Sequence, residues 1–254
     1  MIELLLNPLR INSYAWLATF ACAFINGLSK GGLKGLGMVT IPIMVFIYGG
    51  MASTGLLLPM LIFSDMLAVR MYRKNMQWRQ VKKLLPWVFP GLTLAVFVGK
   101  FINDDTFRNI IAILIIMSLA IIIFFDFFGK KINFSKSPIL SAFTGLIGGF
   151  ASMIGNAAGP IFNLFLLSTR IPKNNFIATA AIFFLTMNVI KVPLHIFVWH
   201  SITWNTFHMN LLMLPAIVTG VMAGKKITSY IPEKTFRYLV LFIIALSALL
   251  LLIK

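Results

Sequence analysis

The chain has 254 residues, of which 59% are hydrophobic and 11% are charged. A soluble domain would carry about 25% charged residues, so this composition excludes an ordinary globular protein and predicts a membrane protein. The formal net charge is +16, which could suggest nucleic-acid binding. The basic residues, however, lie in short stretches between long apolar segments, where they set orientation in the membrane. The lipid bilayer is therefore the expected partner, and nucleic acid is not.

The apolar segments are continuous, as in helices, and do not alternate as the short strands of a barrel do. In chain order, we predict helices over 13–28, 36–47, 51–72, 84–101 and 107–128, and then over 138–154, 157–169, 176–199, 211–225 and 236–253. The expected fold class is an all-α polytopic membrane protein, a single integral membrane domain over residues 1–254. It would contain roughly eight to ten transmembrane helices or half-helices.

The second half of the chain repeats the first in diverged form. The matching features are Gly37 to Pro42 with Gly155 to Pro160, Pro86 and Gly91 with Pro215 and Gly220, and Thr106-Phe107-Arg108 with Thr235-Phe236-Arg237. We place repeat 1 at about residues 13–128 and repeat 2 at about 138–254. Each repeat has an odd number of segments, so the second enters the membrane in the opposite orientation. Two inverted-topology repeats are typical of secondary transporters.

Basic residues are concentrated in alternate loops of the chain. They lie within 70–83, 130–136, 170–173 and 225–237, whereas the stretches 48–50, 103–105 and 200–205 are poor in Lys and Arg. The positive-inside rule places the first set in the cytoplasm. Both termini are then predicted to lie on the periplasmic or extracellular side.

The second segment of each repeat is short and follows a glycine-rich break, 27–35 in the first half and 145–159 in the second. Non-helical backbone at membrane depth is tolerated only where it is buried in protein or lines a wet cavity. Half-helices at such breaks would point partially positive amide groups at an anion. The other interpretation is close helix packing, which small residues allow. Glycine-broken hairpins near the midplane and fully crossing segments both stay open.

Two charged residues, Asp65 and Lys191, lie inside long apolar segments. Aligning Trp78 with Trp204 places the two charges at matching positions in the repeats. A charge at the bilayer centre costs about 2.5–3.5 kcal/mol, so each charge needs a partner or a function. One interpretation is a buried Asp65–Lys191 pair that locks the halves together. The other makes Lys191 an anion-binding charge and Asp65 a proton-coupling or gating carboxylate.

The other candidates for substrate binding lie at the breaks or one turn from Lys191. Lys30 and Lys34 flank the first break, either as ordinary topology signals or as part of an anion vestibule. The neutral candidates are Asn26, Ser29, Gly31, Gly32, Ser152, Gly155, Asn156 and Asn188. His195 and His200 have no acid or cysteine nearby for a zinc site, and an interfacial position is the favoured interpretation.

We predict no catalytic residue, no metal and no cofactor. An enzyme is not expected, because the apolar segments offer one internal carboxylate and no nucleophile–base spacing. The chain has one cysteine, Cys22, so no internal disulfide can form.

The ordered motifs resemble those of the sulfite exporter TauE/SafE family of bacterial inner-membrane permeases. The resemblance rests on the breaks from Gly31-Gly32 to Pro42 and from Gly148-Gly149 to Pro160, on Asn75 and Trp78 in the first basic loop, and on the two Thr-Phe-Arg sequences. It implies transport of a small sulfur-containing anion, such as sulfite or an organosulfonate. Lys30 and Lys34 interrupt the glycine run that is usual in this family, and Ala178-Thr179-Ala180-Ala181 stands where members often have Thr-Ser.

The leading functional prediction is a secondary transporter that moves a sulfite-like or sulfoacetate-like anion across the bacterial inner membrane by alternating access. Proton coupling is an additional hypothesis. A passive anion channel is the first alternative, and a transporter of a small carboxylate or another non-sulfur anion is the second. The expected partners are the anionic substrate and the bilayer, and a homo-oligomer is left open.

Overall fold

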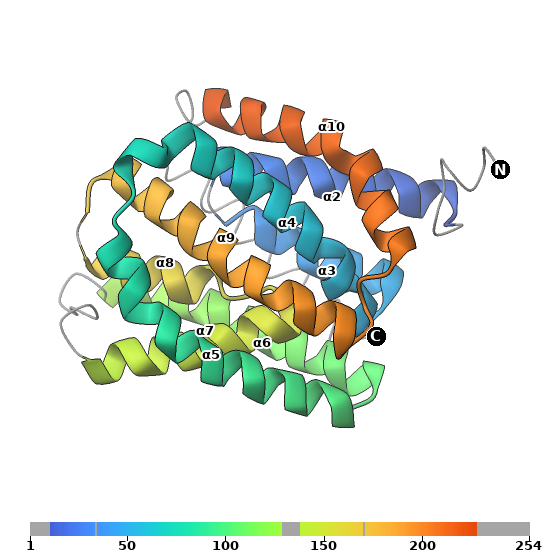
Figure 1. The fold of residues 1–254 in the computed structure, drawn as a ribbon, viewed down its shortest axis with the longest axis horizontal. Helices are drawn as coiled ribbons and strands as arrows, with labels where there is room; N and C mark the ends of the chain where they lie inside the picture. The colour runs from blue at the N-terminus through green and yellow to red at the C-terminus, as the bar shows by residue number, and fades with distance from the viewer. Residues whose placement is uncertain (1–10, 34, 129–137, 170, 228–254) are drawn as a thin grey trace.

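The computed structural model describes residues 11–33, 35–128, 138–169 and 171–227, and this part of the chain is helical, without strands (Figure 1). The elements are α2 (Ser13–Gly31), α3 (Gly37–Tyr48), α4 (Gly50–Tyr72), the 3-10 turn η1 (Arg73–Asn75), α5 (Trp78–Phe101), α6 (Asp104–Phe128), α7 (Pro138–Gly155), α8 (Gly159–Ser168), α9 (Lys173–Phe197) and α10 (Trp204–Ile227). The helix predicted over 236–253 and both predicted terminal orientations fall outside the described residues.

Among the described helices, five are long and apolar enough to cross a membrane: α4, α5, α7, α9 and α10. This confirms the predicted class, an all-α membrane protein that crosses the bilayer several times. The short helices predicted after each break are also present, α3 with 12 residues and α8 with 10. Whether they cross the bilayer or return as hairpins stays a prediction.

Two helices begin earlier than the apolar segments indicated. α5 starts at Trp78 and α10 at Trp204, where the sequence predicted starts at residues 84 and 211. In α5, Val81 and Leu84 are buried while Lys82 and Lys83 between them are exposed. This first turn is therefore amphipathic, and a search for unbroken apolar runs misses it. Trp78 and Trp204, aligned in the predicted repeat, are both first residues of their helices.

The helices form an arrangement in which α2 lies beside α10, α5 lies beside α7, and α4 and α9 run between these pairs (Figure 1). Under the predicted duplication, α2 corresponds to α7 and α10 corresponds to α5. The α2–α10 pair therefore corresponds to the α7–α5 pair. The duplication itself stays a prediction. The opposite orientation of the halves in the membrane stays a prediction.

Glycines bring the outer helix pairs into backbone contact. A Cβ atom on Gly27 would meet the carbonyl oxygen of Ile217, and one on Gly31 would meet that of Val221, both in α10. In the second pair, a Cβ atom on Gly149 of α7 would meet the carbonyl oxygen of Val88 in α5. These glycines therefore serve close helix packing, as small residues do between membrane helices.

The break between α2 and α3 is made by glycines with positive φ, Gly32 at 143° and Gly35 at 96°. In the second half, α7 ends at Gly155 and Asn156 adopts a φ of 53° before α8 begins. Residues other than glycine, asparagine and aspartate rarely adopt a positive φ. Both glycine-rich stretches therefore interrupt helices, as the sequence predicted.

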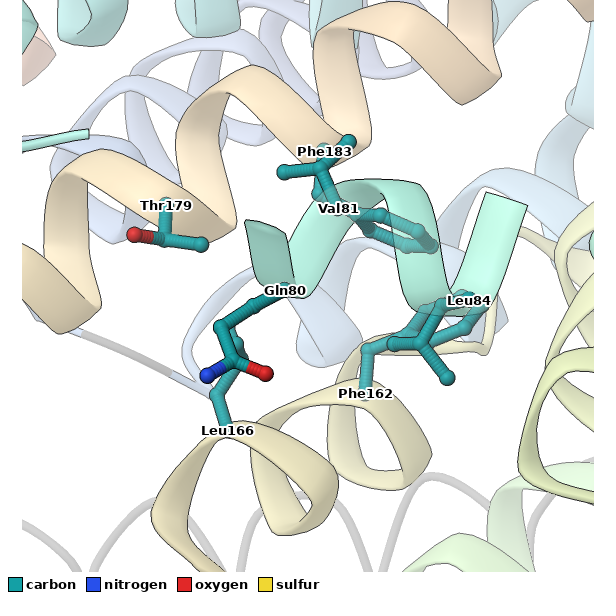
Figure 2. A pocket seen from close by; sticks show the side chains of 7 residues that line it. All are labelled: Gln80, Val81, Leu84, Phe162, Leu166, Thr179 and Phe183. Atoms are coloured by element: carbon teal, nitrogen blue, oxygen red, sulfur yellow. The ribbon is translucent and has the colours of Figure 1, made fainter. Parts of the chain in front are cut away.

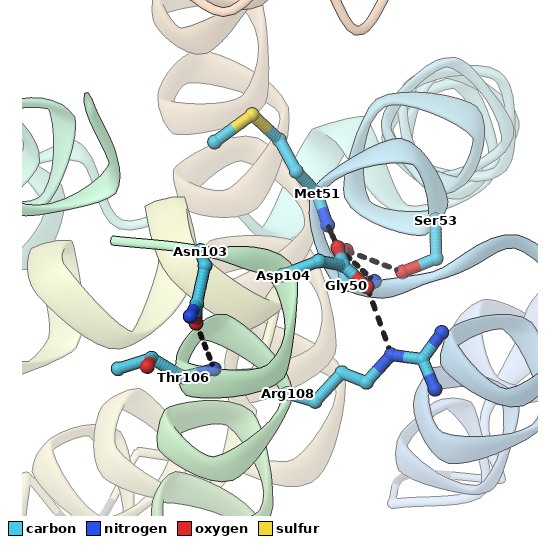
Figure 3. Close-up of polar contacts among 7 residues, drawn as sticks. All are labelled: Gly50, Met51, Ser53, Asn103, Asp104, Thr106 and Arg108. Atoms are coloured by element: carbon cyan, nitrogen blue, oxygen red, sulfur yellow. Dashed lines mark hydrogen bonds and ion pairs between the residues drawn. The ribbon is translucent and has the colours of Figure 1, made fainter. Parts of the chain in front are cut away.

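Asp104 joins the start of α6 to the start of α4 (Figure 3). Its Oδ1 accepts hydrogen bonds from the backbone nitrogens of Gly50 at 2.8 Å and Met51 at 3.3 Å. Its Oδ2 accepts one from Arg108 Nε at 2.9 Å. The sequence analysis left Asp104 between two predicted helices, but it lies in the first turn of α6. The N-cap residue Asn103 accepts a hydrogen bond from Thr106 N at 2.8 Å. The Asp104 carboxylate therefore accepts hydrogen bonds from backbone amides at the N-terminus of α4, which have no partner within their own helix.

We expect Asp104→Ala to lower the free energy of unfolding by about 1–2 kcal/mol, because it removes a carboxylate from the N-terminus of α4. Arg108→Ala should cost less than about 0.5 kcal/mol, because exposed ion pairs contribute little. Thermal unfolding of both variants in detergent measures the difference. Equal losses would contradict a capping role for Asp104.

Candidate functional site

One face of α9 carries a row of polar side chains in the middle of the molecule. Asn188, Lys191 and His195 follow helical spacing, and their exposed fractions are 2%, 0% and 0%. Phe184 continues the same face toward the start of the helix. From Phe184 to His195 the row extends about 16 Å along the helix axis, roughly half of the hydrocarbon thickness.

Helices α2 and α4 contribute an ion pair to this row. Lys30 Nζ in the last turn of α2 lies 2.7 Å from Asp65 Oδ1 in α4. The other carboxylate oxygen accepts a hydrogen bond from Asn188 Nδ2 at 3.0 Å. The Lys30 ammonium group also lies 4.5 Å from the ring centroid of Phe184, a cation–π geometry. Lys30, Asp65 and Asn188 therefore connect α2, α4 and α9.

This pairing corrects one sequence-based interpretation. The direct Asp65–Lys191 lock is wrong, because Asp65 pairs with Lys30 and Lys191 is bound by other groups. Alignment of the repeats equates positions along the chain, but it does not say which neighbouring helix supplies a partner. α4 and α9 run antiparallel, since Gln77 N donates to Thr179 Oγ1 at 3.0 Å near the end of α4 and the start of α9.

Lys191 is held by neutral acceptors from the second break. Its Nζ donates to the backbone oxygen of Ser152 at 2.7 Å, to Ser152 Oγ at 3.2 Å and to Asn156 Oδ1 at 2.5 Å. These three bonds use all three donors of the ammonium group. Asn156 Nδ2 donates in turn to Thr54 O at 3.3 Å, which connects the break to α4.

The charges in this buried region do not cancel. Asp65 is neutralised by Lys30, whereas Lys191 has no carboxylate within ion-pair distance in the part of the chain that the structure describes. An uncompensated charge inside a protein carries a desolvation penalty of several kcal/mol, which neutral hydrogen bonds offset only in part. The arrangement is therefore suited to accept one negative charge.

Space is present beside the N-terminus of α8, near these groups in sequence. A Cβ atom on Gly159 would meet no heavy atom within 4 Å. Gly159 is the first residue of α8 and follows Asn156 by three positions. A helix N-terminus carries partial positive charge, which adds to the attraction of an anion near Lys191.

The candidates at the first break form a separate group. Thr40 Oγ1 donates a hydrogen bond to Asn26 Oδ1 at 3.4 Å. Among the described residues, none accepts a hydrogen bond from the buried Asn26 Nδ2. A Cβ atom on Gly37 would lie 3.2 Å from Ser29 Oγ, so Ser29 belongs to this group. Lys34 lies outside the described residues.

The structure thus gathers Lys30, Asp65, Ser152, Asn156, Asn188 and Lys191 around one row and leaves Asn26 and Ser29 at the α2–α3 break. The candidate glycines are explained by helix ends or by helix packing. Gly32 ends α2, and a Cβ atom on Gly155 would lie 3.3 Å from Ile111 Cγ1. Whether any of these residues binds substrate stays a prediction.

The sequence analysis did not predict the burial of His195. An interfacial position was favoured, but its side chain is fully buried, with Nδ1 2.7 Å from Ser201 Oγ. Its Nε2 has no hydrogen-bond partner within the described part of the chain. Its ring also stands edge-on to Trp199 at 5.1 Å between centroids. Its four-residue spacing from Lys191 was the available signal.

A small apolar pocket lies between α5, α8 and α9 (Figure 2), beside the Phe184 end of this row. It is lined by Gln80, Val81, Leu84, Phe162, Leu166, Thr179 and Phe183. None of these residues carries a charge that would hold an anion. The pocket is therefore a packing feature of the bundle and not a candidate anion site.

The helical bundle and its buried charged row define a multi-pass membrane protein with an ionisable interior, the pattern expected of transport proteins. The model of the sulfite exporter TauE/SafE family matches residues 16–251, nearly the whole chain. The chain belongs to this family of membrane transporters. No curated protein and no solved structure matches the chain.

Proposed function

We propose that this chain is a secondary transporter that moves a small anion across the bacterial inner membrane by alternating access. The proposed substrate is a sulfur oxyanion or an organosulfonate, of the sulfite or sulfoacetate type. The observation that carries the proposal is the buried ammonium group of Lys191, which neutral acceptors surround. Both termini on the periplasmic side and two inverted repeats belong to the same proposal.

An entering anion would compete for the donors of Lys191. An oxyanion would add a direct charge–charge attraction to the hydrogen bond from the Lys191 ammonium group. It can therefore displace the neutral acceptors Asn156 Oδ1 or Ser152 Oγ. Both residues belong to the end of α7 and the break before α8. Occupation of the site would therefore change the hydrogen bonds that hold the break, which favours a carrier over a passive channel.

Asp65 is proposed as the gating group of this carrier. Its two oxygens hold Lys30 of α2 and Asn188 of α9, so protonation of the carboxylate would weaken both contacts at once. Proton coupling through Asp65 is the mechanism that this arrangement favours. Symport or antiport would then follow from which side of the membrane reaches Asp65.

We expect the purified chain in proteoliposomes to take up labelled sulfite with saturable kinetics and to exchange it against unlabelled sulfite inside. Sulfoacetate, thiosulfate and acetate, tested as competitors at several pH values, define the substrate class and the proton dependence. Competition by acetate alone would favour the carboxylate transporter. Uptake that rises linearly with concentration, without exchange, would favour the anion channel and contradict the carrier.

A further inference from the structure

We propose that His195 is a second substrate-binding residue of this transporter, and that its Nε2–H group donates a hydrogen bond to the anion that Lys191 binds. The inference rests on the proposed function, because it adds a donor to the same site. An anion with two or more oxygen atoms on one centre can accept from both donors at once. Sulfite and organosulfonates both have this form.

His195 and Lys191 lie on the same side of α9. A separation of four residues places two helical positions within about 40° of each other around the axis, with Cβ atoms about 5–6 Å apart. Aromatic side chains in helices lean toward the N-terminus, so the imidazole is directed over the turn that carries Lys191. Both side chains have an exposed fraction of 0%. The two groups are therefore buried neighbours.

Contacts with α4 bring the partners of these two groups close together. Asn156, which accepts a bond from the buried ammonium group, donates from Nδ2 to Thr54 O at 3.3 Å. Ser201, which contacts the imidazole, has its backbone oxygen against Gly55, where an added Cβ atom would collide with it. The surroundings of the ammonium group and of the imidazole therefore meet at consecutive residues of α4.

The imidazole of His195 has one nitrogen with a partner and one without. Nδ1 lies 2.7 Å from Ser201 Oγ, whereas no group in the described part of the chain bonds to Nε2. When the serine hydroxyl donates to Nδ1, the ring proton lies on Nε2, which is then an unused donor. A buried donor without an acceptor is costly. A bound oxyanion supplies the acceptor that this donor lacks.

The two donors would contribute differently to binding. The ammonium group of Lys191 attracts the anion by its charge, and its flexible side chain imposes little direction. The ring of His195 is fixed by Ser201 and by the edge-on contact with Trp199, so its N–H group orients the anion. Neutral imidazole suits this role, because an imidazolium one turn from the ammonium group would be repelled by it.

The competing role for His195 is structural, since its contact with Ser201 connects α9 to the loop before α10. Two substitutions separate the roles. The amide nitrogen of a glutamine side chain reaches the position of the imidazole Nε2, whereas that of asparagine reaches the position of Nδ1. His195→Gln therefore keeps a donor for the anion, and His195→Asn keeps a partner for Ser201.

The experiment measures the KM for uptake of labelled sulfite in proteoliposomes that contain the full chain. We expect His195→Asn to raise the KM about tenfold or more, because it removes the Nε2 donor, with an unfolding temperature close to that of the wild type. The KM of His195→Gln should stay within about threefold of the wild-type value. The matched control is His200→Asn, at an exposed residue whose φ of 50° suits asparagine, and its KM should equal that of the wild type.

A second measurement uses the wild type alone and does not require any His195 variant to fold. The chain has three histidines, so nitrogen-15 labelling of histidine gives three imidazole rings to follow by NMR in detergent. Replacement of His200 and of His208 identifies their signals. We expect the His195 ring to carry its proton on Nε2, and the Nε2 signal to move more than the Nδ1 signal when sulfite is added.

The reverse order of the variants, with a wild-type KM for His195→Asn and a raised KM for His195→Gln, would overturn the inference in favour of the structural role. A wild-type KM in both variants, or an equal increase in both, would overturn it as well. So would an Nε2 signal that carries no proton or does not respond to sulfite. Absence of saturable sulfite uptake by the wild type would instead overturn the proposed function.

Discussion

Replacement of Lys191 by glutamine is expected to abolish high-affinity anion uptake while leaving the protein folded. Glutamine keeps hydrogen-bond donors for Ser152 and Asn156 but removes the buried positive charge. A hydrogen bond to a charged group contributes about 1.5–3 kcal/mol, so the affinity for the anion should fall by roughly 10- to 150-fold. Removal of an uncompensated buried charge should leave the unfolding temperature unchanged or raise it.

The matched control is Lys225→Gln, which removes an exposed lysine in the last turn of α10 and should leave sulfite uptake as in the wild type. Uptake kinetics and thermal unfolding are measured on the same preparations. Wild-type uptake by a folded Lys191→Gln variant would mean that the anion binds elsewhere in the protein.

Gly27→Ala is expected to cause a large loss of stability. The new Cβ atom would collide with the carbonyl oxygen of Ile217 and lie 2.9 Å from the backbone nitrogen of Val221. Backbone atoms cannot rotate away, so α2 and α10 must separate along their contact. Overpacking of this kind costs about 1–3 kcal/mol, and the unfolding temperature should fall clearly.

Gly159→Ala is the matched comparison, because the same change there meets no atom within 4 Å. Its unfolding temperature should stay close to that of the wild type. If the two variants unfolded at the same temperature, the close contact between α2 and α10 would not hold the bundle together.

Composition and the predicted internal duplication were sufficient to predict the membrane fold class, the short second helix of each half and the breaks before them. The starts of α5 at Trp78 and of α10 at Trp204 were not predicted. The start of α5 alternates buried and exposed side chains, and both starts lie outside the unbroken apolar runs by which the helices were predicted. The hydrogen bonds from the N-terminus of α4 to Asp104 were not predicted either. They depend on how closely α4 approaches α6 in the folded bundle.

The candidate site was predicted in its charges but not in their pairing. Asp65 and Lys191 stand out as charges within apolar segments, which is a signal that depends only on the sequence. That Lys30 reaches Asp65 depends on the packing of α2 against α4, and no spacing along the chain encodes it. The burial of His195 likewise depends on the loop at Ser201, whose backbone lies against Gly55 of α4.

Equilibrium binding of labelled sulfite to the purified protein in detergent tests most directly whether a substrate anion completes the charge balance around the α9 row. We predict one saturable site per chain in the wild type, displaced by unlabelled methanesulfonate, with binding reduced at least about tenfold in Lys191→Gln. Binding of equal strength and stoichiometry in the two proteins would contradict this account.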